Sequence, residues 1–260
     1  MLKEVILISR EKIEELAELI KTSRNIVVFT GAGVSTESGV PDFRSPGGIW
    51  DRFDPNEMTF QKFVSSEESR RKYWDLFRTT YKEFQGIEPN QAHLAIAELE
   101  KRDKLSAVVT QNVEELHQKA GNSPGKVLEL HGTMWKIRCL DCETDYPWEE
   151  AYKLLEQGEI PGNCPQCGGL FKPATIAFGQ QLPVRTLKEA QARSCSSDLF
   201  ISIGSSLVVY PAALMPQMAK ESGSALVIIN REPTPFDDIA DLVIHAQAGE
   251  TMKKTVELAE

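Results

Sequence analysis

Two cysteine pairs have the spacing of a metal site. Cys139 and Cys142 form one C-x-x-C pair, Cys164 and Cys167 form another, and 21 residues separate the two pairs. Each pair can occupy two adjacent corners of a tetrahedron, so four thiolates would close the coordination sphere of a structural zinc ion. A redox-active thiol pair is the alternative, and the two matched pairs favour zinc. The odd total of five cysteines argues against a disulfide framework.

A histidine at the end of an apolar run has the position of a general base. His131 follows the apolar run 127–130 and precedes Gly132. An imidazole titrates near neutral pH and can take a proton from a hydroxyl group. Because a lone histidine is more often structural, the position alone leaves both roles open.

A glycine turn follows the first buried run, residues 25–30. Gly31 and Gly33 tolerate positive φ and carry no Cβ, so the backbone can approach a ligand closely there. A helix beginning at this turn would direct its amides at an anion such as a pyrophosphate. The dinucleotide fingerprint is incomplete, because position 36 is Thr and the segment 41–48 cannot form the second strand. An ordinary strand-to-helix turn is therefore the alternative.

Further polar or small residues come directly after other apolar runs. They are Gln111 and Asn112, Gly204, Ser205 and Ser206, and Asn230. In a parallel sheet, ligands bind outside the carboxyl ends of the strands. Serine hydroxyls and backbone amides suit a phosphate, and Asn230 stands where a ribose contact is expected. We therefore expect these strand ends to form one extended cofactor cleft.

Two nearby segments add charged groups. Glu114 lies close to the strand end at 111–112 and suits a ribose or a carboxamide, although it could equally cap a short helix. The triplet Asp42-Phe43-Arg44 lies in a Gly- and Pro-rich loop, residues 39–56. Its arginine could contact a phosphate, and its aromatic ring could cover a reactive centre. A solvated loop with one ion pair is the alternative for this segment.

The apolar periodicity predicts an α/β fold. The strand-like runs are almost continuously apolar and alternate with amphipathic segments, which indicates a parallel sheet with helices on both faces. The expected strands are 25–30, 105–110, 127–130, 175–178, 199–203, 225–229 and 242–244, and the expected helices are 11–21, 59–84, 89–101, 114–120, 184–193, 211–221 and 251–258. We interpret the aromatic residues of 59–84 as core.

Length and charge narrow the function classes. The chain has 260 residues, 41% of them hydrophobic, which suits one large domain or a large domain with a small satellite. The net charge of −9 argues against nucleic acid as a direct ligand and favours a cationic partner. No apolar run reaches the ~20 residues that span a membrane. Residues 1–8 are too short for a signal peptide, so a cytoplasmic protein is expected. The oligomeric state is not defined, and a monomer fits the sequence.

Taken together, these residues resemble the sirtuins, the NAD-dependent protein-lysine deacylases, in the form of a prokaryotic-type single catalytic domain. The shared motifs run in order from about residue 30 to 230. They are Gly31-Ala32-Gly33-Val34-Ser35, the segment 38–45, the segment 110–114, Leu116-His117 with Ala120-Gly121, His131-Gly132, the four paired cysteines, Phe178-Gly179, the segment 204–213, and Asn230.

The resemblance implies a division into domains and a reaction. Residues 1–54, 87–136 and 173–260 would form a Rossmann-like NAD-binding domain, and the helical insert 55–86 would join the zinc ribbon 137–172 in a small domain. NAD and an acyl-lysine protein or peptide would enter the cleft between them from opposite sides. The products would be nicotinamide, O-acetyl-ADP-ribose and free lysine.

The resemblance also implies residue roles. His131 would take a proton from a ribose hydroxyl, and the four paired cysteines would hold one structural zinc ion. The cofactor-binding residues would be Gly31, Ala32, Gly33, Ser35, Asp42, Phe43, Arg44, Gln111, Asn112, Glu114, Gly204, Ser205, Ser206 and Asn230. The substrate-binding residues would be Ile176, Phe178, Gly179, Leu207, Val208 and Val209, which would pair with the peptide as an added strand.

Three features depart from the family pattern. Glu114 stands where the family usually has Asp, and Gln180 stands where it commonly has Glu. Phe77 and Thr80 occupy the positions of a Tyr-x-x-Arg pair found in members that prefer dicarboxylic acyl groups. We therefore expect acetyl, or a longer apolar acyl group, to be preferred over succinyl. Mono-ADP-ribosyl transfer to a protein and a non-catalytic NAD- or peptide-binding module are the alternative functions.

Overall fold

A six-stranded parallel sheet forms the larger part of the molecule. The computed structural model describes residues 9–260, so residues 1–8, for which we expect no signal peptide, lie outside the described residues. The strands are β1 (Ile26–Thr30), β2 (Leu105–Thr110), β3 (Val127–Glu129), β7 (Leu199–Ile203), β8 (Ala225–Ile229) and β9 (Leu242–Ile244). Their order is β3-β2-β1-β7-β8-β9, and all neighbouring pairs are parallel. The strand order reverses between β1 and β7, which is where ligands bind in such sheets.

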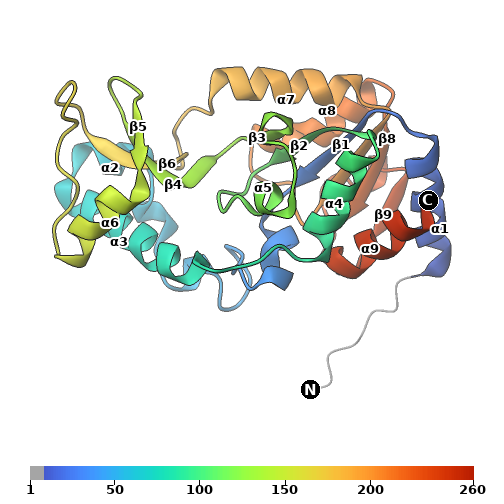
Figure 1. Ribbon diagram of the computed structural model, residues 1–260, viewed down its shortest axis with the longest axis horizontal. Helices are drawn as coiled ribbons and strands as arrows, with labels where there is room; N and C mark the ends of the chain where they lie inside the picture. The colour runs from blue at the N-terminus through green and yellow to red at the C-terminus, as the bar shows by residue number, and fades with distance from the viewer. Residues whose placement is uncertain (1–8) are drawn as a thin grey trace.

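Helices cover both faces of this sheet (Figure 1). One face carries α1 (Arg10–Thr22), α4 (Gln91–Lys101) and α9 (Ala248–Leu258), and the other carries α7 (Val184–Ser196) and α8 (Met215–Glu221). Because side chains alternate along a strand, Ile26 and Val28 pack against the first group, and Val27 and Phe29 against the second. The short helix α5 (Leu116–Ala120) packs against α4. These layers confirm the predicted α/β fold.

A three-stranded antiparallel sheet lies at the other end of the molecule (Figure 1). Its order is β5-β4-β6, formed by β4 (Gly132–Cys139), β5 (Asp145–Pro147) and β6 (Phe171–Thr175). The helices α2 (Phe60–Ser65), α3 (Glu67–Phe84) and α6 (Trp148–Glu156) pack with this sheet, and α6 was not predicted. Most aromatic residues of the insert are buried there, as expected: Phe63, Tyr73, Trp74, Tyr81 and Phe84. Phe60 and Phe77 are only partly buried.

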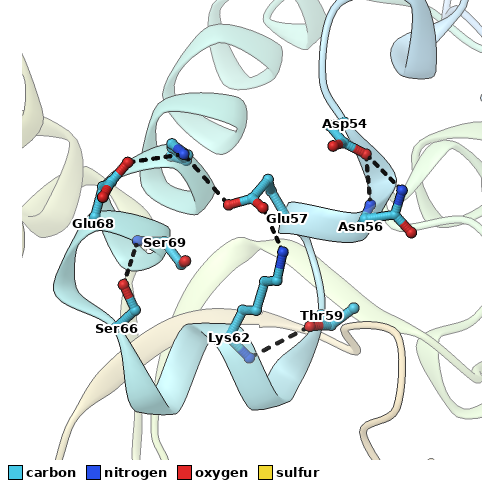
Figure 2. Close-up of polar contacts among 9 residues, drawn as sticks. Asp54, Asn56, Glu57, Thr59, Lys62, Ser66, Glu68 and Ser69 are labelled. Atoms are coloured by element: carbon cyan, nitrogen blue, oxygen red, sulfur yellow. Dashed lines mark hydrogen bonds and ion pairs between the residues drawn. The ribbon is translucent and has the colours of Figure 1, made fainter.

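Side-chain caps divide the helical insert, predicted as one stretch, into α2 and α3 (Figure 2). The Thr59 hydroxyl accepts a hydrogen bond from the Lys62 amide at the start of α2 (3.4 Å), and the Ser66 hydroxyl accepts one from the Ser69 amide at the start of α3 (3.2 Å). Ser66 has extended backbone dihedrals and therefore ends the first helix. An ion pair between Glu57 and Lys62 links α2 to the preceding turn.

Short 3₁₀ helices form several connections: Ala32–Ser38, Ile49–Asp51, Pro55–Glu57, Pro124–Lys126, Ala212–Leu214 and Asp237–Ile239. The helix expected after the glycine turn is the first of these. The helices expected at 114–120 and 211–221 begin later, at Leu116 and Met215. Within residues 9–260, no helix combines the length and the apolar character needed to cross a membrane.

The strand predicted at 175–178 is wrong. β6 ends at Thr175 and pairs with β4 in the small sheet, not with the parallel sheet. Beyond it, the Ile176 amide donates to the His131 carbonyl (2.8 Å), and the Phe178 carbonyl accepts from the Phe60 amide (2.9 Å). The backbone of 176–178 thus bonds to two different elements instead of continuing a ladder.

Gly132 connects the two sheets. It has a φ of 73°, and a Cβ built on it would lie 2.0 Å from the Ala174 carbonyl oxygen. The chain leaves the large sheet after β3, passes His131, and enters β4 at Gly132. Only glycine combines this backbone conformation with such close contact to β6.

Replacing Gly132 with alanine is expected to destabilise the protein by about 2–4 kcal/mol, because the new methyl group meets a carbonyl oxygen in a left-handed backbone conformation. Urea unfolding followed by circular dichroism measures this change. Gly125→Ala is the matched control, since among the described residues no heavy atom beyond its chain neighbours lies within 4 Å of a Cβ built there. Equal unfolding free energies for the two variants would contradict the requirement for glycine at 132.

Candidate active site

The carboxyl ends of five parallel strands line one cleft of about 700 Å³. The strand-end residues in it are Gly31, Ala32 and Gly33 after β1, Gln111 and Asn112 after β2, His131 after β3, Gly204, Ser205 and Ser206 after β7, and Asn230 after β8. Asp42, Phe43 and Arg44 from the loop 39–56 line the same cleft. The structure therefore brings together the residues that the sequence placed at separate strand ends.

The glycine turn after β1 packs directly against the turn after β7. The Gly33 amide donates to the Gly204 carbonyl (2.8 Å), and the Gly31 amide donates to the Ile203 carbonyl (3.1 Å). A Cβ on Gly33 would lie 2.8 Å from the same Gly204 oxygen. These glycines are thus required by protein packing, and their own amides are occupied by protein carbonyls. The sequence analysis did not foresee this packing role, and the close approach of a ligand to the turn stays a prediction.

Ser205 keeps a free hydroxyl proton at the reversal of strand order. Its oxygen accepts hydrogen bonds from the Gln111 side-chain amide (2.9 Å) and from the Leu207 amide (3.3 Å). Because both of these contacts use oxygen lone pairs, the Ser205 O–H can donate to an anionic group in the cleft. At the far end of the cleft, the side-chain amide of Asn230 donates to the Glu232 carbonyl (2.7 Å).

Ser35 and Glu114 line a smaller inner cavity of about 80 Å³, which shares Gln111 and Asn112 with the cleft. The Glu114 carboxylate accepts from the Ser35 hydroxyl (2.5 Å), the Asn112 side-chain amide (3.1 Å) and the Val113 backbone amide (3.0 Å). It makes no contact with the amides of α5, so the helix-capping alternative is wrong. Burial raises the pKa of Glu114 above its ordinary value.

His131 is held with one ring nitrogen facing the protein. Its Nδ1 lies 3.0 Å from the Gln111 carbonyl oxygen, and because a carbonyl can only accept, Nδ1 carries the proton. In the neutral ring, Nε2 then has a free lone pair. Burial lowers the pKa of His131 below its ordinary value of 6.5, so the ring is neutral at pH 7. A neutral, oriented imidazole in a cleft has the properties of a general base.

The loop 39–56 is ordered by Asp42. Its carboxylate accepts from the backbone amides of Arg44 (3.0 Å) and Ser45 (2.7 Å), so it organises a turn and does not pair with the guanidinium. Phe43 is 43% exposed at the cleft. Its ring centroid lies 5.2 Å from that of Trp50.

Some of the predicted substrate residues share the cleft and some do not. Ile176, Phe178, Gly179 and Val209 line it. The Leu207 side chain is 1% exposed and packs in the core beneath α7 and α8, while Val208 is exposed but lies outside the cleft lining. The predicted substrate contacts of Leu207 and Val208 therefore stay a prediction, since neither residue is part of the cleft lining.

Trp50, Tyr73 and Thr175 line the cleft but are not predicted from the sequence. Trp50 lies between Phe43 and Phe178, with its ring centroid 5.8 Å from that of Phe178. The available signal for Trp50 was its place in an unusually long loop. Tyr73 and Thr175 had no such signal, because each lies in a segment that reads as core.

The four paired cysteines form a compact cluster whose sulfur atoms all lie within 4.8 Å of one another. The Sγ–Sγ distances are 3.4 Å between Cys139 and Cys167 and 3.8 Å between Cys142 and Cys164. Tetrahedral zinc with bonds of about 2.3 Å places its sulfur ligands roughly 3.8 Å apart. The four thiolates therefore fit one zinc ion and leave no ligand position for water, as a structural site requires.

The sheet and its cleft define a Rossmann-type nucleotide-binding fold with a zinc-ribbon extension. The family model described as "Sir2 family" matches residues 31–211, and the chain belongs to the Sir2 family, the sirtuins. A "NAD-dependent protein deacetylase" of Thermodesulfovibrio yellowstonii is 44% identical over 248 residues, covering 95% of each chain. A "NAD-dependent protein deacylase 2" of Archaeoglobus fulgidus is 45% identical, covering 95% of this chain and 96% of that protein.

Solved structures agree with this family membership. A Sir2 structure described as "Structural Basis for the Mechanism and Regulation of Sir2 Enzymes" matches with a TM-score of 0.85 and 44% identity, covering 96% of this chain and 98% of that chain. A second, "Sir2-p53 peptide-NAD+", matches with a TM-score of 0.85 and 38% identity, covering 94% and 97%. The resemblance expected from the sequence motifs is confirmed.

Replacing Cys164 and Cys167 together with alanine is expected to abolish zinc binding and to lower the melting temperature by on the order of 10 °C, because structural zinc binding contributes directly to folding free energy. Elemental analysis and thermal unfolding measure the two effects. Cys195→Ala is the control, since Cys195 is exposed on α7 and outside the cluster. A metal-free double variant with wild-type stability would contradict the structural role of zinc.

Proposed function

We propose that this protein is an NAD-dependent protein-lysine deacetylase that forms nicotinamide, O-acetyl-ADP-ribose and free lysine. The observation that carries the proposal is His131, whose Nδ1–H is fixed by the Gln111 carbonyl, so that the lone pair of Nε2 is free to accept a proton. This base shares one cleft with the glycine turn and Ser205. The names of the relatives at 44% and 45% identity support the same activity.

NAD supplies the ribose carbon that loses nicotinamide and the ribose hydroxyl that receives the acyl group. Along the cleft, we assign the glycine turn, Arg44 and the segment 204–206 to the phosphates and Asn230 to the distal ribose. Asp42 would contribute by holding the turn that carries Arg44. The Ser205 hydroxyl proton supports this assignment, because it is available for an anion. Cleft volumes of about 300–1,000 Å³ suit ligands of this kind.

We assign the inner cavity to the carboxamide of nicotinamide. Ser35, Asn112 and Glu114 already hydrogen-bond to one another there, so donors and acceptors are oriented before a ligand enters. Phe43, half-exposed at the cleft, is positioned to exclude water when the nicotinamide bond breaks. Gln111 would hold both the imidazole, through its carbonyl, and the turn after β7, through its side chain.

His131 would take the proton of the ribose hydroxyl at Nε2. Its lowered pKa keeps the ring unprotonated at neutral pH, and the hydrogen bond to Gln111 keeps the ring from rotating. Cys139, Cys142, Cys164 and Cys167 would hold zinc, which supplies structural support only, since no ligand position is open.

We further propose that the partners are acyl-lysine proteins or peptides and that the peptide backbone pairs with Phe178–Gly179 on one side and 207–209 on the other. The burial of Leu207 supports this, because it anchors the second segment in the core. The acyl-lysine would lie against Phe43, Ile176, Phe178 and Val209, all in the cleft lining. The domain division given above remains part of this proposal.

A cytoplasmic location and the absence of a nucleic-acid partner complete the proposal. Four thiolates that bind zinc need a reducing compartment. The net charge of −9 opposes binding to phosphate backbones and favours lysine-rich protein partners.

His131→Ala is expected to lower turnover of an acetyl-lysine peptide by roughly 10²–10⁴-fold and to leave NAD binding intact, because only the proton acceptor is removed. In the wild-type protein, kcat/KM should fall on the acidic side with a midpoint below pH 6.5, since the folded protein protonates this imidazole only at lower pH.

Mass spectrometry of the products separates the candidate functions. O-acetyl-ADP-ribose supports deacetylation, whereas an ADP-ribose unit added to a protein supports mono-ADP-ribosyl transfer. A His131→Ala variant that retains every function of the wild type would instead indicate a non-catalytic NAD- or peptide-binding module.

Acetyl-lysine peptides are expected to be used at least about ten-fold more efficiently than succinyl-lysine peptides, because an unpaired carboxylate is costly in an apolar cavity. The Thr80 hydroxyl donates to the Leu76 carbonyl (2.9 Å). The end of an acyl group in the cleft would meet Phe77, which lines the cleft and, together with Thr80, one wall of the inner cavity. The only charged residue in its lining, within the described residues, is Glu114.

Parallel kcat/KM measurements on matched peptides test this preference. Thr80→Arg should raise succinyl turnover relative to acetyl turnover, and Thr80→Val serves as its control. Wild-type protein that prefers the succinyl peptide would contradict the assignment of this cavity wall.

A further inference from the structure

Lys172 is a buried lysine that the proposed reaction does not use. It lies on β6 with a relative exposure of 1%. Its ammonium donates to the carbonyl oxygens of Pro173 (3.0 Å) and Thr175 (2.5 Å), and it lies 5.1 Å from the centroid of the Tyr73 ring. Across the small sheet, Lys172 is paired in register with Arg138, whose guanidinium is bound to Asp145 (2.6 Å). The ammonium is therefore held by carbonyl dipoles and an aromatic face, with no carboxylate partner among residues 9–260.

Such a placement is energetically expensive. An ammonium removed from water without an anionic partner is strongly destabilised, and an apolar side chain of similar volume would avoid that cost. Consistent with this, burial lowers the pKa of Lys172 to about 7. The role of a lysine at this position must therefore lie in the contacts that its ammonium makes.

Those contacts lie at the corner where the small sheet meets the cleft. Thr175 and Tyr73 both line the cleft, and their hydroxyl groups lie 3.5 Å apart. The next residue, Ile176, also lines the cleft, and its amide donates to the His131 carbonyl (2.8 Å). The ammonium thus binds the Thr175 carbonyl at the end of β6. The next residue, Ile176, makes the backbone hydrogen bond that joins this side of the cleft to His131.

We propose that Lys172 is a positioning residue for the acyl-lysine wall, the part of the cleft lining at Ile176 and Phe178 against which the acyl-lysine would lie. Its ammonium fixes the carbonyls of Pro173 and Thr175 and the ring of Tyr73, and thereby sets the position of Ile176 relative to His131. The consequence for catalysis rests on the function proposed above. The contact geometry itself does not, and it can be tested separately.

The first measurement is hydrogen exchange of the Ile176 amide, read by NMR in the zinc-loaded protein. In Lys172→Met this amide should exchange about ten-fold faster, because a charge-assisted clamp on the preceding carbonyl is lost. Lys172→Arg should restore slow exchange, since a guanidinium can donate to two carbonyls and stack on an aromatic ring. Lys153 is an exposed lysine of α6, so Lys153→Met is the control, and its Ile176 amide should exchange at the wild-type rate.

The second measurement is steady-state kinetics with NAD and an acetyl-lysine peptide. Lys172→Met should raise the KM for the peptide about ten-fold and change the KM for NAD less than about two-fold, because the clamp supports only the acyl-lysine wall. Lys172→Arg should restore the peptide KM. Should Lys172→Met fail to fold, Lys172→Gln replaces it, with the same direction of change expected in both measurements.

Unchanged Ile176 exchange in the neutral variant would overturn the proposal. So would an equal rise in both KM values, or a Lys172→Arg variant as impaired as Lys172→Met. Wild-type protein that binds acetylated and unmodified peptides equally would overturn the proposed function instead, and the exchange measurement would still decide the role of Lys172.

Discussion

The close contact between two glycine turns, one after β1 and one after β7, is the constraint on which the rest of the site depends. The turns touch through the Gly33 amide and the Gly204 carbonyl, and a Cβ on Gly204 would lie 2.2 Å from the Val34 nitrogen. Because the turns meet, Ser205 comes within hydrogen-bonding distance of Gln111, and the ends of three strands form one surface. The cleft is thus a result of backbone packing at the reversal of strand order, and a ligand that binds there meets groups already fixed by the protein.

Gln111 connects the packed turns to the base, His131. Its side chain binds the turn after β7, and its carbonyl binds the ring of His131. Next to it, Asn112 binds Ser35 and Glu114, so the inner cavity is also connected to β2. Two consecutive residues at one strand end therefore determine the orientation of both regions in which the proposed chemistry takes place.

The parts of this structure that depend on local pattern could be predicted from the sequence. Continuous apolar runs identified β1, β2, β7 and β8, because strands covered on both faces need no polar alternation. The cysteine spacing identified the metal cluster, because each C-x-x-C pair is itself a local pattern. The position of His131 indicated a base only in combination with the family motifs. Other features depend on contacts between distant segments. The inward turn of Glu114, the burial of Leu207 and the end of β6 at Thr175 are set by partners far away in the chain, and a lysine at 172 reads as a surface residue until its carbonyl partners are known.

The strand β4 begins at the residue after His131 and ends at the zinc ligand Cys139. At about 3.3 Å per residue, one extended segment of roughly 26 Å carries the imidazole at one end and a thiolate at the other. A zinc ion held by the four cysteines would have no open ligand position, yet it would fix the far end of the segment that begins next to His131. Loss of the ion would free the Cys139 end of β4, and because β4 is continuous with His131, the orientation of the imidazole would change with it.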